Sequence, residues 1–165
     1  MRIGIVVRCV LVFSLGYSAC NARELNLTYP ALSFSDLLLK AVAPSGLPTV
    51  RLRLGKGFLS AEVAHTPRQN ASGLSTRGIL EHDGAMLFTF SPPRRVVFSM
   101  RNTRIPLSCA YIGEDGTVLE TYDMLPGSPS PLASKSDRVQ FVLEVNRGWF
   151  EQHGVAAGTR VMVAD

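Results

Sequence analysis

The chain has 165 residues, of which 46% are hydrophobic and 18% are charged, with 17 Lys and Arg against 13 Asp and Glu. Removing the first 22 residues, which include Arg2 and Arg8, leaves 143 residues with 15 basic and 13 acidic side chains, a formal charge of +2. That length is enough for one domain with a real core and too short for two. So small a basic excess argues against a nucleic-acid-binding protein, and we expect no nucleic-acid partner.

The first 22 residues have the features of an export signal. Arg2 and Arg8 flank and interrupt an apolar run over residues 3–15, which is too short to span a bilayer, and small residues follow it. A signal peptidase could cut after Ala22, or a lipoprotein peptidase could cut before Cys20 and leave that cysteine lipidated. An uncleaved amino-terminal anchor is the third alternative. We therefore expect export to the periplasm or cell envelope, with membrane contact only through a lipid anchor or an uncleaved signal.

Cleavage after Ala22 leaves Cys109 as the only cysteine, which excludes an internal disulfide. Leu107 and Tyr111 share its parity in an extended chain. We therefore expect Cys109 to be a small buried hydrophobic residue rather than a reactive thiol.

Residues 23–49 show no clear repeat and contain Pro30, Pro44 and Pro48, so we interpret them as a tether and residues 50–165 as a single β-rich domain. Within that domain, residues 50–54 alternate apolar and basic side chains. Residues 58–64 follow after Gly-Lys-Gly, and this pattern predicts a hairpin. Thr66 before Pro67 is typical of a helix cap and predicts a short helix over residues 67–72.

Further strands are expected at residues 86–90, 96–100, 107–112, 117–124, 139–145 and 160–163, with a turn at 91–95, a loop at 125–136 and a last helical turn within 146–153. In the strand at 139–145, alternation places Glu144 on a polar face and predicts that only the other face is covered. About seven or eight short strands with one or two accessory helices indicate a mainly β (α+β) fold, a compact antiparallel barrel or sandwich.

The densest polar cluster lies in the elbow, Arg101–Pro106, between two apolar runs. The side chains of Asn102 and Thr103 could satisfy main-chain groups within the turn. Alternatively Arg101, Asn102, Thr103 and Arg104 could form a polar pocket in which a guanidinium group holds an anionic ligand. Glu144 could pair with one of these arginines. These five residues are our candidate ligand-binding site.

We expect no metal, no cofactor and no assigned catalytic residue. His65, His82 and His153 are far apart and have no cysteine or carboxylate at metal-ligand spacing. The serines lie in loops without a Gly-x-Ser-x-Gly elbow.

Short motifs from about Phe58 to Val163 occur in a characteristic order. They are Gly73-Leu74 with Arg77, Met86-Leu87-Phe88 with Phe90, Phe98 with Met100, Asn102-Thr103, Ile105-Pro106-Leu107, Asp115-Gly116, Val142-Leu143-Glu144, Gly148, and Gly154 with Gly158. This series resembles the family known as domain of unknown function 192, an uncharacterised and mostly prokaryotic group whose members often carry an export signal. The resemblance implies a compact β-rich domain and no established activity.

Four positions depart from the family pattern. Ser99 and Arg101 stand in the place of tryptophan and lysine, Ser75 in that of methionine, and Ser108 in that of aspartate. If the family aspartate acts as a general acid, a ligand contact or a metal contact, Ser108 lacks the necessary carboxylate.

The favoured function is therefore an exported, non-catalytic domain that binds a small or anionic ligand near the elbow, because donors gather there without a nucleophile and base. One alternative is a cell-envelope hydrolase or modifying enzyme whose catalytic groups converge only on folding. A second is a structural or assembly factor that presents a sheet edge to another envelope protein.

Overall fold

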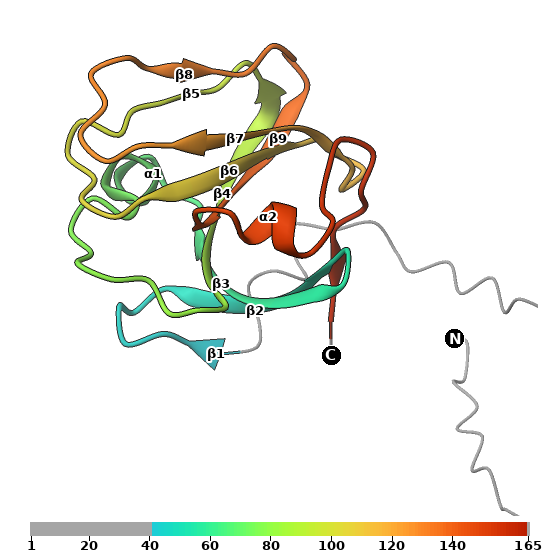
Figure 1. The fold of residues 1–165 in the computed structure, drawn as a ribbon, viewed down its shortest axis with the longest axis horizontal. Coiled ribbons are helices and arrows are strands. Elements are labelled where there is room, and N and C mark those ends of the chain that lie inside the picture. Colours follow the sequence, from blue (N-terminus) through green and yellow to red (C-terminus); the bar gives the residue numbers. More distant parts are fainter. Residues whose placement is uncertain (1–40, 165) are drawn as a thin grey trace, which may run out of the picture.

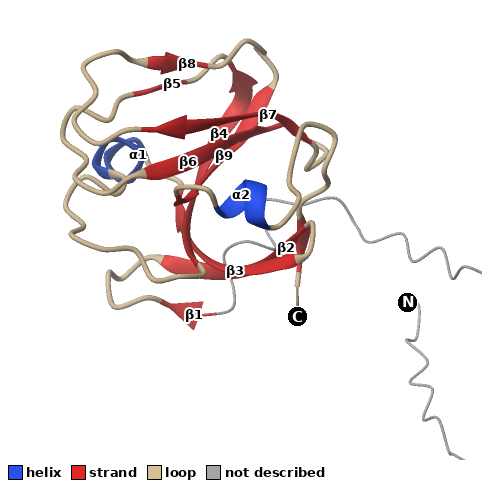
Figure 2. Cartoon of the chain, in the orientation of Figure 1, coloured by secondary structure: helices blue, strands red, loops and turns tan. Residues whose placement is uncertain are grey.

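The computed structural model describes residues 41–164. Its elements are β1 Ala41–Val42, β2 Pro48–Leu54, β3 Gly57–Ala64, α1 Pro67–Ser72, β4 Gly84–Arg94, β5 Val97–Phe98, β6 Leu107–Ile112, β7 Val118–Met124, β8 Leu132–Ala133, β9 Val139–Asn146, α2 Trp149–Gln152 and β10 Met162–Val163. Strands dominate, and the two helices are short (Figure 2). The predicted mainly β fold with one or two accessory helices is confirmed.

One strongly curled sheet organises the domain (Figure 1). Its strand order is β1-β2-β3-β4-β9-β6-β7, with β10 also paired to β2, while β5 and β8 form a separate two-stranded ribbon. Neighbouring strands are antiparallel except β3 and β4, which run parallel. Among the described strands, β1 and β7 end the order without pairing to each other, so the sheet is a half-open barrel.

The segment before β10 joins the two ends of this sheet. Gly158 N–H donates to the Val118 carbonyl at 2.8 Å, and Val118 N–H donates to the Thr159 carbonyl at 2.8 Å. A few residues later, Met162 pairs with Arg53 of β2. The carboxyl-terminal segment therefore bridges the start of β7 and the end of β2, and it closes the barrel there.

Two local predictions are confirmed. The hairpin of β2 and β3 turns at Gly55 and Lys56, with Leu54 opposite Gly57. Helix α1 begins at Pro67 after Thr66, whose hydroxyl accepts a hydrogen bond from the third helical N–H, as in a capping box. Because β3 and β4 are parallel, the connection over residues 65–83, which we call the crossover, must return along the sheet and carries α1 with it.

Apolar side chains form a core on each face of the sheet. One core, inside the curl, includes Leu52, Leu143 and Trp149, and the other includes Leu74 and Phe88. Strand β6, which lies between β9 and β7, is buried at all six positions, so it contributes to both cores. Cys109 belongs to the second core as a buried free thiol, which agrees with the expected hydrophobic role.

The expected one-sided burial of β9 is wrong. Val142 and Glu144 point to the opposite face from Leu143 and Val145, yet all four side chains are buried. The face of Val142 and Glu144 is covered by the crossover and by the ribbon of β5 and β8, which supply Leu74, Val96, Phe98 and Leu132 to the second core. Glu144 is therefore enclosed rather than solvated.

The sheet already includes residues before position 50, where we expected the domain to start. Ala41 and Val42 pair with Thr49 and Pro48, so residues 41–49 belong to the sheet and not to a tether. Strand β4 continues to Arg94, through residues that we predicted to turn. The export signal with its candidate lipidation site Cys20, and the rest of the tether, lie outside the described residues. Within residues 41–164, no helix has the length and apolar character needed to cross a membrane.

Candidate functional site

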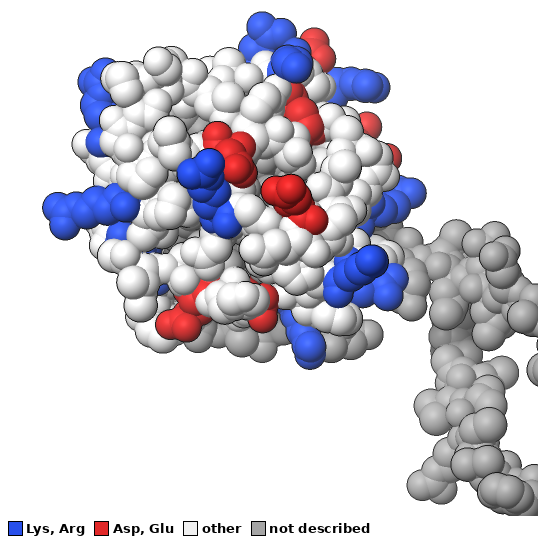
Figure 3. All heavy atoms as spheres, viewed as in Figure 1, with Lys and Arg blue, Asp and Glu red and all other residues white. Residues whose placement is uncertain are grey.

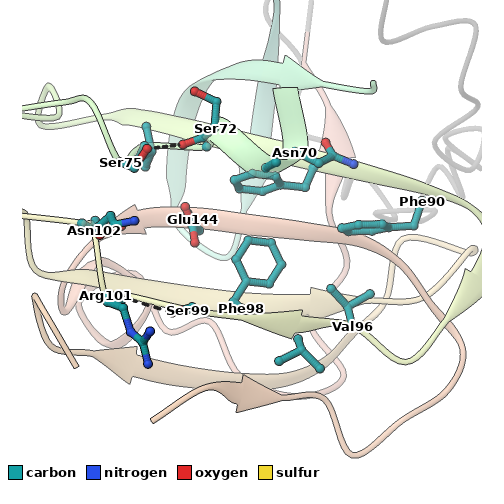
Figure 4. Close-up of a pocket in the computed structure, with 16 residues that line it drawn as sticks. Asn70, Ser72, Ser75, Phe90, Val96, Phe98, Ser99, Arg101, Asn102 and Glu144 are labelled. Carbon is teal, nitrogen blue, oxygen red and sulfur yellow. Dashed lines mark hydrogen bonds between the residues drawn. The ribbon is translucent and has the colours of Figure 1, made fainter. Parts of the chain in front are cut away.

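A cavity of about 430 Å³ lies between the crossover and the elbow (Figure 4). Its wall is made of Asn70, Ala71, Ser72, Gly73, Leu74, Ser75, Phe88, Phe90, Val96, Val97, Phe98, Ser99, Arg101, Asn102, Thr103 and Glu144. The crossover, the elbow and the strands β4, β5 and β9 thus each contribute to one enclosure. Its volume falls within the range of small-molecule sites.

The crossover forms one wall and is attached to the sheet at a few points. Helix α1 has no buried residue, whereas Leu74 just after it is 2% exposed. Asn70 Nδ2 donates to the Thr89 carbonyl at 3.2 Å. Arg77 Nη2 donates to both carboxylate oxygens of Glu62 in β3, at 2.9 and 2.7 Å. This ion pair and the buried leucine hold the crossover over the sheet.

Aromatic side chains form the apolar part of the wall. The rings of Phe88 and Phe98 meet edge to face, with centroids 4.8 Å apart, and Phe98 also contacts Tyr111 at 6.5 Å. Phe90 lines the same cavity and is 7% exposed. The cavity therefore combines aromatic surface with hydroxyl and amide groups, as ligand sites commonly do.

The elbow is held by main-chain hydrogen bonds. Thr103 N–H donates to the Met100 carbonyl at 3.0 Å, and Gly127 N–H donates to the carbonyls of Met100 and Thr103 at 3.0 and 3.1 Å. Within residues 41–164, the side chains of Asn102 and Thr103 make no hydrogen bond to the main chain. The local turn-stabilising role that we considered for them is therefore absent, and both side chains border the cavity.

Glu144 is the acidic residue of the cavity floor, and its side chain projects between Asn102 and Phe98 in Figure 4. It is 4% exposed and lies on β9 between Met86 of β4 and Cys109 of β6. In the described part of the chain its carboxyl group has neither a hydrogen bond nor an ion pair. Burial raises its pKa to about 8, so the group is mostly protonated at neutral pH.

The predicted pairing of Glu144 with an arginine is wrong. Arg101 and Arg104 are both exposed, and Arg101 points away from Glu144 in Figure 4. Arg104 does not line this cavity; it borders an adjoining, more open hollow, whose other lining residues are Ser75, Arg101, Asn102, Thr103, Pro126 and Gly127. Long arginine side chains commonly keep the guanidinium group in water, which agrees with the exposure of both residues.

Four of the five predicted residues thus border one cavity: Arg101, Asn102, Thr103 and Glu144. Sequence reasoning missed the wall contributed by the crossover and the phenylalanines. Gly73, Leu74, Phe88, Phe90 and Phe98 were all present among the family motifs, but strand parity presented the aromatic residues as core. Their position around a buried carboxyl group follows only from the tertiary arrangement.

Three of the four departures from the family pattern fall on the cavity, since Ser75, Ser99 and Arg101 all line it. At Ser75 and Ser99 the pattern has methionine and tryptophan. A serine side chain is far smaller than either, and it adds a hydroxyl group. These two replacements therefore leave space in the cavity and make its wall more polar.

Ser108, the departure that removes a carboxylate, lies elsewhere. It pairs with Val145, so it occupies the opposite face of the sheet from Glu144. Its Oγ accepts a hydrogen bond from Gly148 N–H at 2.9 Å and donates to Asp123 Oδ1 at 2.5 Å across β6 and β7. Ser108 thus anchors the start of α2, with a carboxylate supplied by the neighbouring strand, and it takes no part in the cavity.

Charged side chains are dispersed on the face shown in Figure 3, where acidic and basic residues alternate over a largely uncharged surface. In the part of the chain that the structure describes, no three His, Cys, Asp or Glu side chains come together as a metal site.

Comparison with known proteins identifies the relatives of this chain. A model of the family DUF192, described as an uncharacterized ACR, matches residues 50–163. No curated protein matches the chain.

The similar solved structures include the following two. One is a protein from Novosphingobium aromaticivorans DSM 12444 described as of unknown function, 31% identical, with a TM-score of 0.69 over 79% of this chain and 96% of that one. The other is a protein from Sinorhizobium meliloti 1021, whose description proposes that it is a transcription regulator. It is 30% identical, with a TM-score of 0.68 over 76% of this chain and 98% of that one. Since the family match covers more than half of the sequence, the chain belongs to the DUF192 family, domain of unknown function 192.

Proposed function

We propose that this protein is an exported, non-catalytic domain that binds a small ligand in the cavity above Glu144. The observation that carries the proposal is the buried carboxyl group of Glu144, which has no partner among the described residues. Burying a polar group without a hydrogen bond lowers stability, and such groups concentrate at functional sites. A ligand that enters the cavity supplies the missing partner.

The geometry does not favour a site that holds an anion between two arginines. The two arginines expected to grip an anion do not converge on the cavity, since Arg101 points outward and Arg104 lies outside it. The surrounding polar groups are the uncharged side chains of Asn102 and Thr103 and nearby serines. We therefore favour a small ligand that is not an anion.

Export is part of the proposal because residues 1–22 have the sequence features of a leader. Mass spectrometry of the mature amino terminus in cell-envelope fractions tests it. A terminus after Ala22, or a lipidated Cys20, is the expected result. A cytoplasmic protein that retains Met1 would contradict export.

Crystal soaking and NMR titration with small sugars, amines, carboxylates and phosphates test the binding function on the full chain. Ligand density in the cavity, and shifts of the amide signals of Phe98 and Glu144, are expected. Ser99→Trp restores the family residue at the cavity mouth and should weaken binding at least tenfold, an effect of about 1.4 kcal/mol. Ser130→Trp, in an exposed loop, is the matched control. Density only in a distant hollow would overturn the proposal.

An envelope hydrolase or modifying enzyme is the second candidate, favoured by the same carboxyl group. A pKa of about 8 at Glu144 suits a group that gives and takes protons near neutral pH. Assays on ester, phosphate and peptidoglycan substrates test this alternative. Turnover that disappears in Glu144→Gln would replace the binding proposal, and a lack of turnover on all three classes would leave binding as the function.

A further inference from the structure

We propose that the cavity receives the ammonium group of a small amine, with the carboxylate of Glu144 as its counter-ion. This inference rests on the proposed function, because it names the class of ligand for the same site. It follows from the hydrogen-bond acceptors and aromatic rings around Glu144, and from the lack of a cation among the described residues that face it.

No cation faces Glu144 from the described elements that pack around it. Strand β6 presents Cys109 and Tyr111, neither of which carries a positive charge, and β4 presents Met86. The elbow contributes Arg101 at the rim, which points away. A carboxylate enclosed in this way has a strong unmet preference for a positive partner, because Coulomb attraction is greater where water is excluded.

Two groups at this wall offer hydrogen-bond acceptors that have no partner among the described residues. They are the ionised carboxyl group of Glu144 and Asn70 Oδ1, which is enclosed by the protein. An ammonium group carries three donors and no acceptor. One N–H can bond to Glu144, and water or the other hydroxyl groups that line the cavity, such as that of Thr103, can accept from the remaining two.

The aromatic wall also suits a cation. Phe88, Phe90 and Phe98 line the cavity beside the carboxyl group, and the negative faces of aromatic rings attract cations. The same rings provide apolar surface for the carbon skeleton of the ligand. An anion would meet a carboxyl group and an aromatic wall, and it would gain from neither.

The charge state of Glu144 gives the amine a pH signature. With a pKa of about 8, roughly one tenth of the empty sites are ionised at pH 7 and about one hundredth at pH 6. An ammonium ion binds the ionised form, so its affinity should rise about tenfold from pH 6 to pH 7 and level off above pH 8. Binding at pH 7 should release about 0.9 proton per ligand from Glu144. A neutral ligand releases none.

Benzylamine, benzyl alcohol and benzoate are suitable probes, since they differ in the group that would meet Glu144. Chemical-shift titration of the full chain at pH 6, 7 and 8 gives their affinities, and calorimetry in two buffers of different ionisation enthalpy gives the proton release. Benzylamine should bind at least tenfold more tightly than the other two at pH 8. Glu144→Gln should reduce benzylamine to the affinity of benzyl alcohol, and Glu114→Gln, at an exposed position, should leave it unchanged.

The outcomes separate the two levels of the proposal. If benzyl alcohol shifts the cavity signals and benzylamine binds no better, with no proton release, the amine assignment is overturned while the binding function stands. If no probe in the wider soaking panel enters the cavity, both are overturned. Proton release from the unmodified protein tests the assignment even if Glu144→Gln does not fold.

Discussion

Replacing Glu144 by glutamine should make the protein more stable at neutral pH. The side chain is 96% buried, since only 4% of it is exposed, and burial raises its pKa from 4.5 to about 8. Between these pH values the unfolded chain has an ionised Glu144, whereas the folded protein must bind a proton there. Stability is therefore lost as the pH rises through this window, by about 1.4 kcal/mol per pH unit.

The size of the effect follows from the same values. At pH 7, which is 2.5 pH units above 4.5, the free energy of unfolding should be about 3 kcal/mol lower than for a neutral side chain of the same shape. Below about pH 4 the carboxyl group is protonated in both states, and the difference should vanish. Glutamine has the shape of the protonated acid, so Glu144→Gln should gain about 3 kcal/mol at pH 7 and almost nothing at pH 4.

Urea unfolding at pH 4, 5.5, 7 and 8 measures this difference, with the fluorescence of Trp149, the single tryptophan of the chain, as the signal. Trp149 is 2% exposed, so its emission should shift on unfolding. Glu114→Gln controls for the loss of a carboxylate at an exposed position. A gain that is the same at every pH would refute the reasoning, because it would show that the pKa of Glu144 is the same in the folded and unfolded states. A loss at pH 7 would also refute it, because it would show that Glu144 is ionised and paired in the folded protein.

Three further substitutions test the structural account by urea unfolding. Gly55→Ala should lower the free energy of unfolding by about 3 kcal/mol. Gly55 has φ +54°, and a Cβ there would lie 2.3 Å from the main-chain oxygen of His153, just after α2. The control Gly78→Ala, with open space around it, should cost less than about 0.5 kcal/mol. Ser108→Asp should cost about 1 kcal/mol by opposing Asp123 across the strands, and a second change, Asp123→Ser, should restore most of the loss; no recovery would contradict the anchoring role. Thr66→Ala should cost about 1 kcal/mol by removing the cap of α1, and an unchanged midpoint would show that α1 does not need it.

Features encoded by neighbouring residues were predictable from the sequence. Thr66 before Pro67 marked the start of α1, and Gly55 with Lys56 marked the first hairpin turn. Asp115 caps the later turn, since its Oδ1 accepts the N–H of Thr117 at 3.0 Å. In each case the interaction that fixes the conformation joins residues within a few positions, so the pattern is complete in a short window.

Features that depend on distant segments were not predictable in the same way. Strand parity put Glu144 on the polar side of β9, and only the tertiary fold shows the crossover and the ribbon of β5 and β8 covering that side. Sequence reasoning singled out the elbow, and Arg101, Asn102 and Thr103 border the cavity, but the direction of the arginine side chains depends on what lies beneath them. An acidic residue within the apolar run Val142-Leu143-Glu144-Val145 was the local sign of the buried site.

The single parallel pairing in the sheet has a consequence for how this family can vary. Because β3 and β4 run in the same direction, the crossover, residues 65–83, must span the sheet. The crossover covers the cavity, and α1 within it has no buried residue. Substitutions in the crossover can change the shape of the cavity without breaking any strand pairing. The scaffold can therefore remain constant through evolution while the occupant changes, and homologues with the same barrel need not share a ligand.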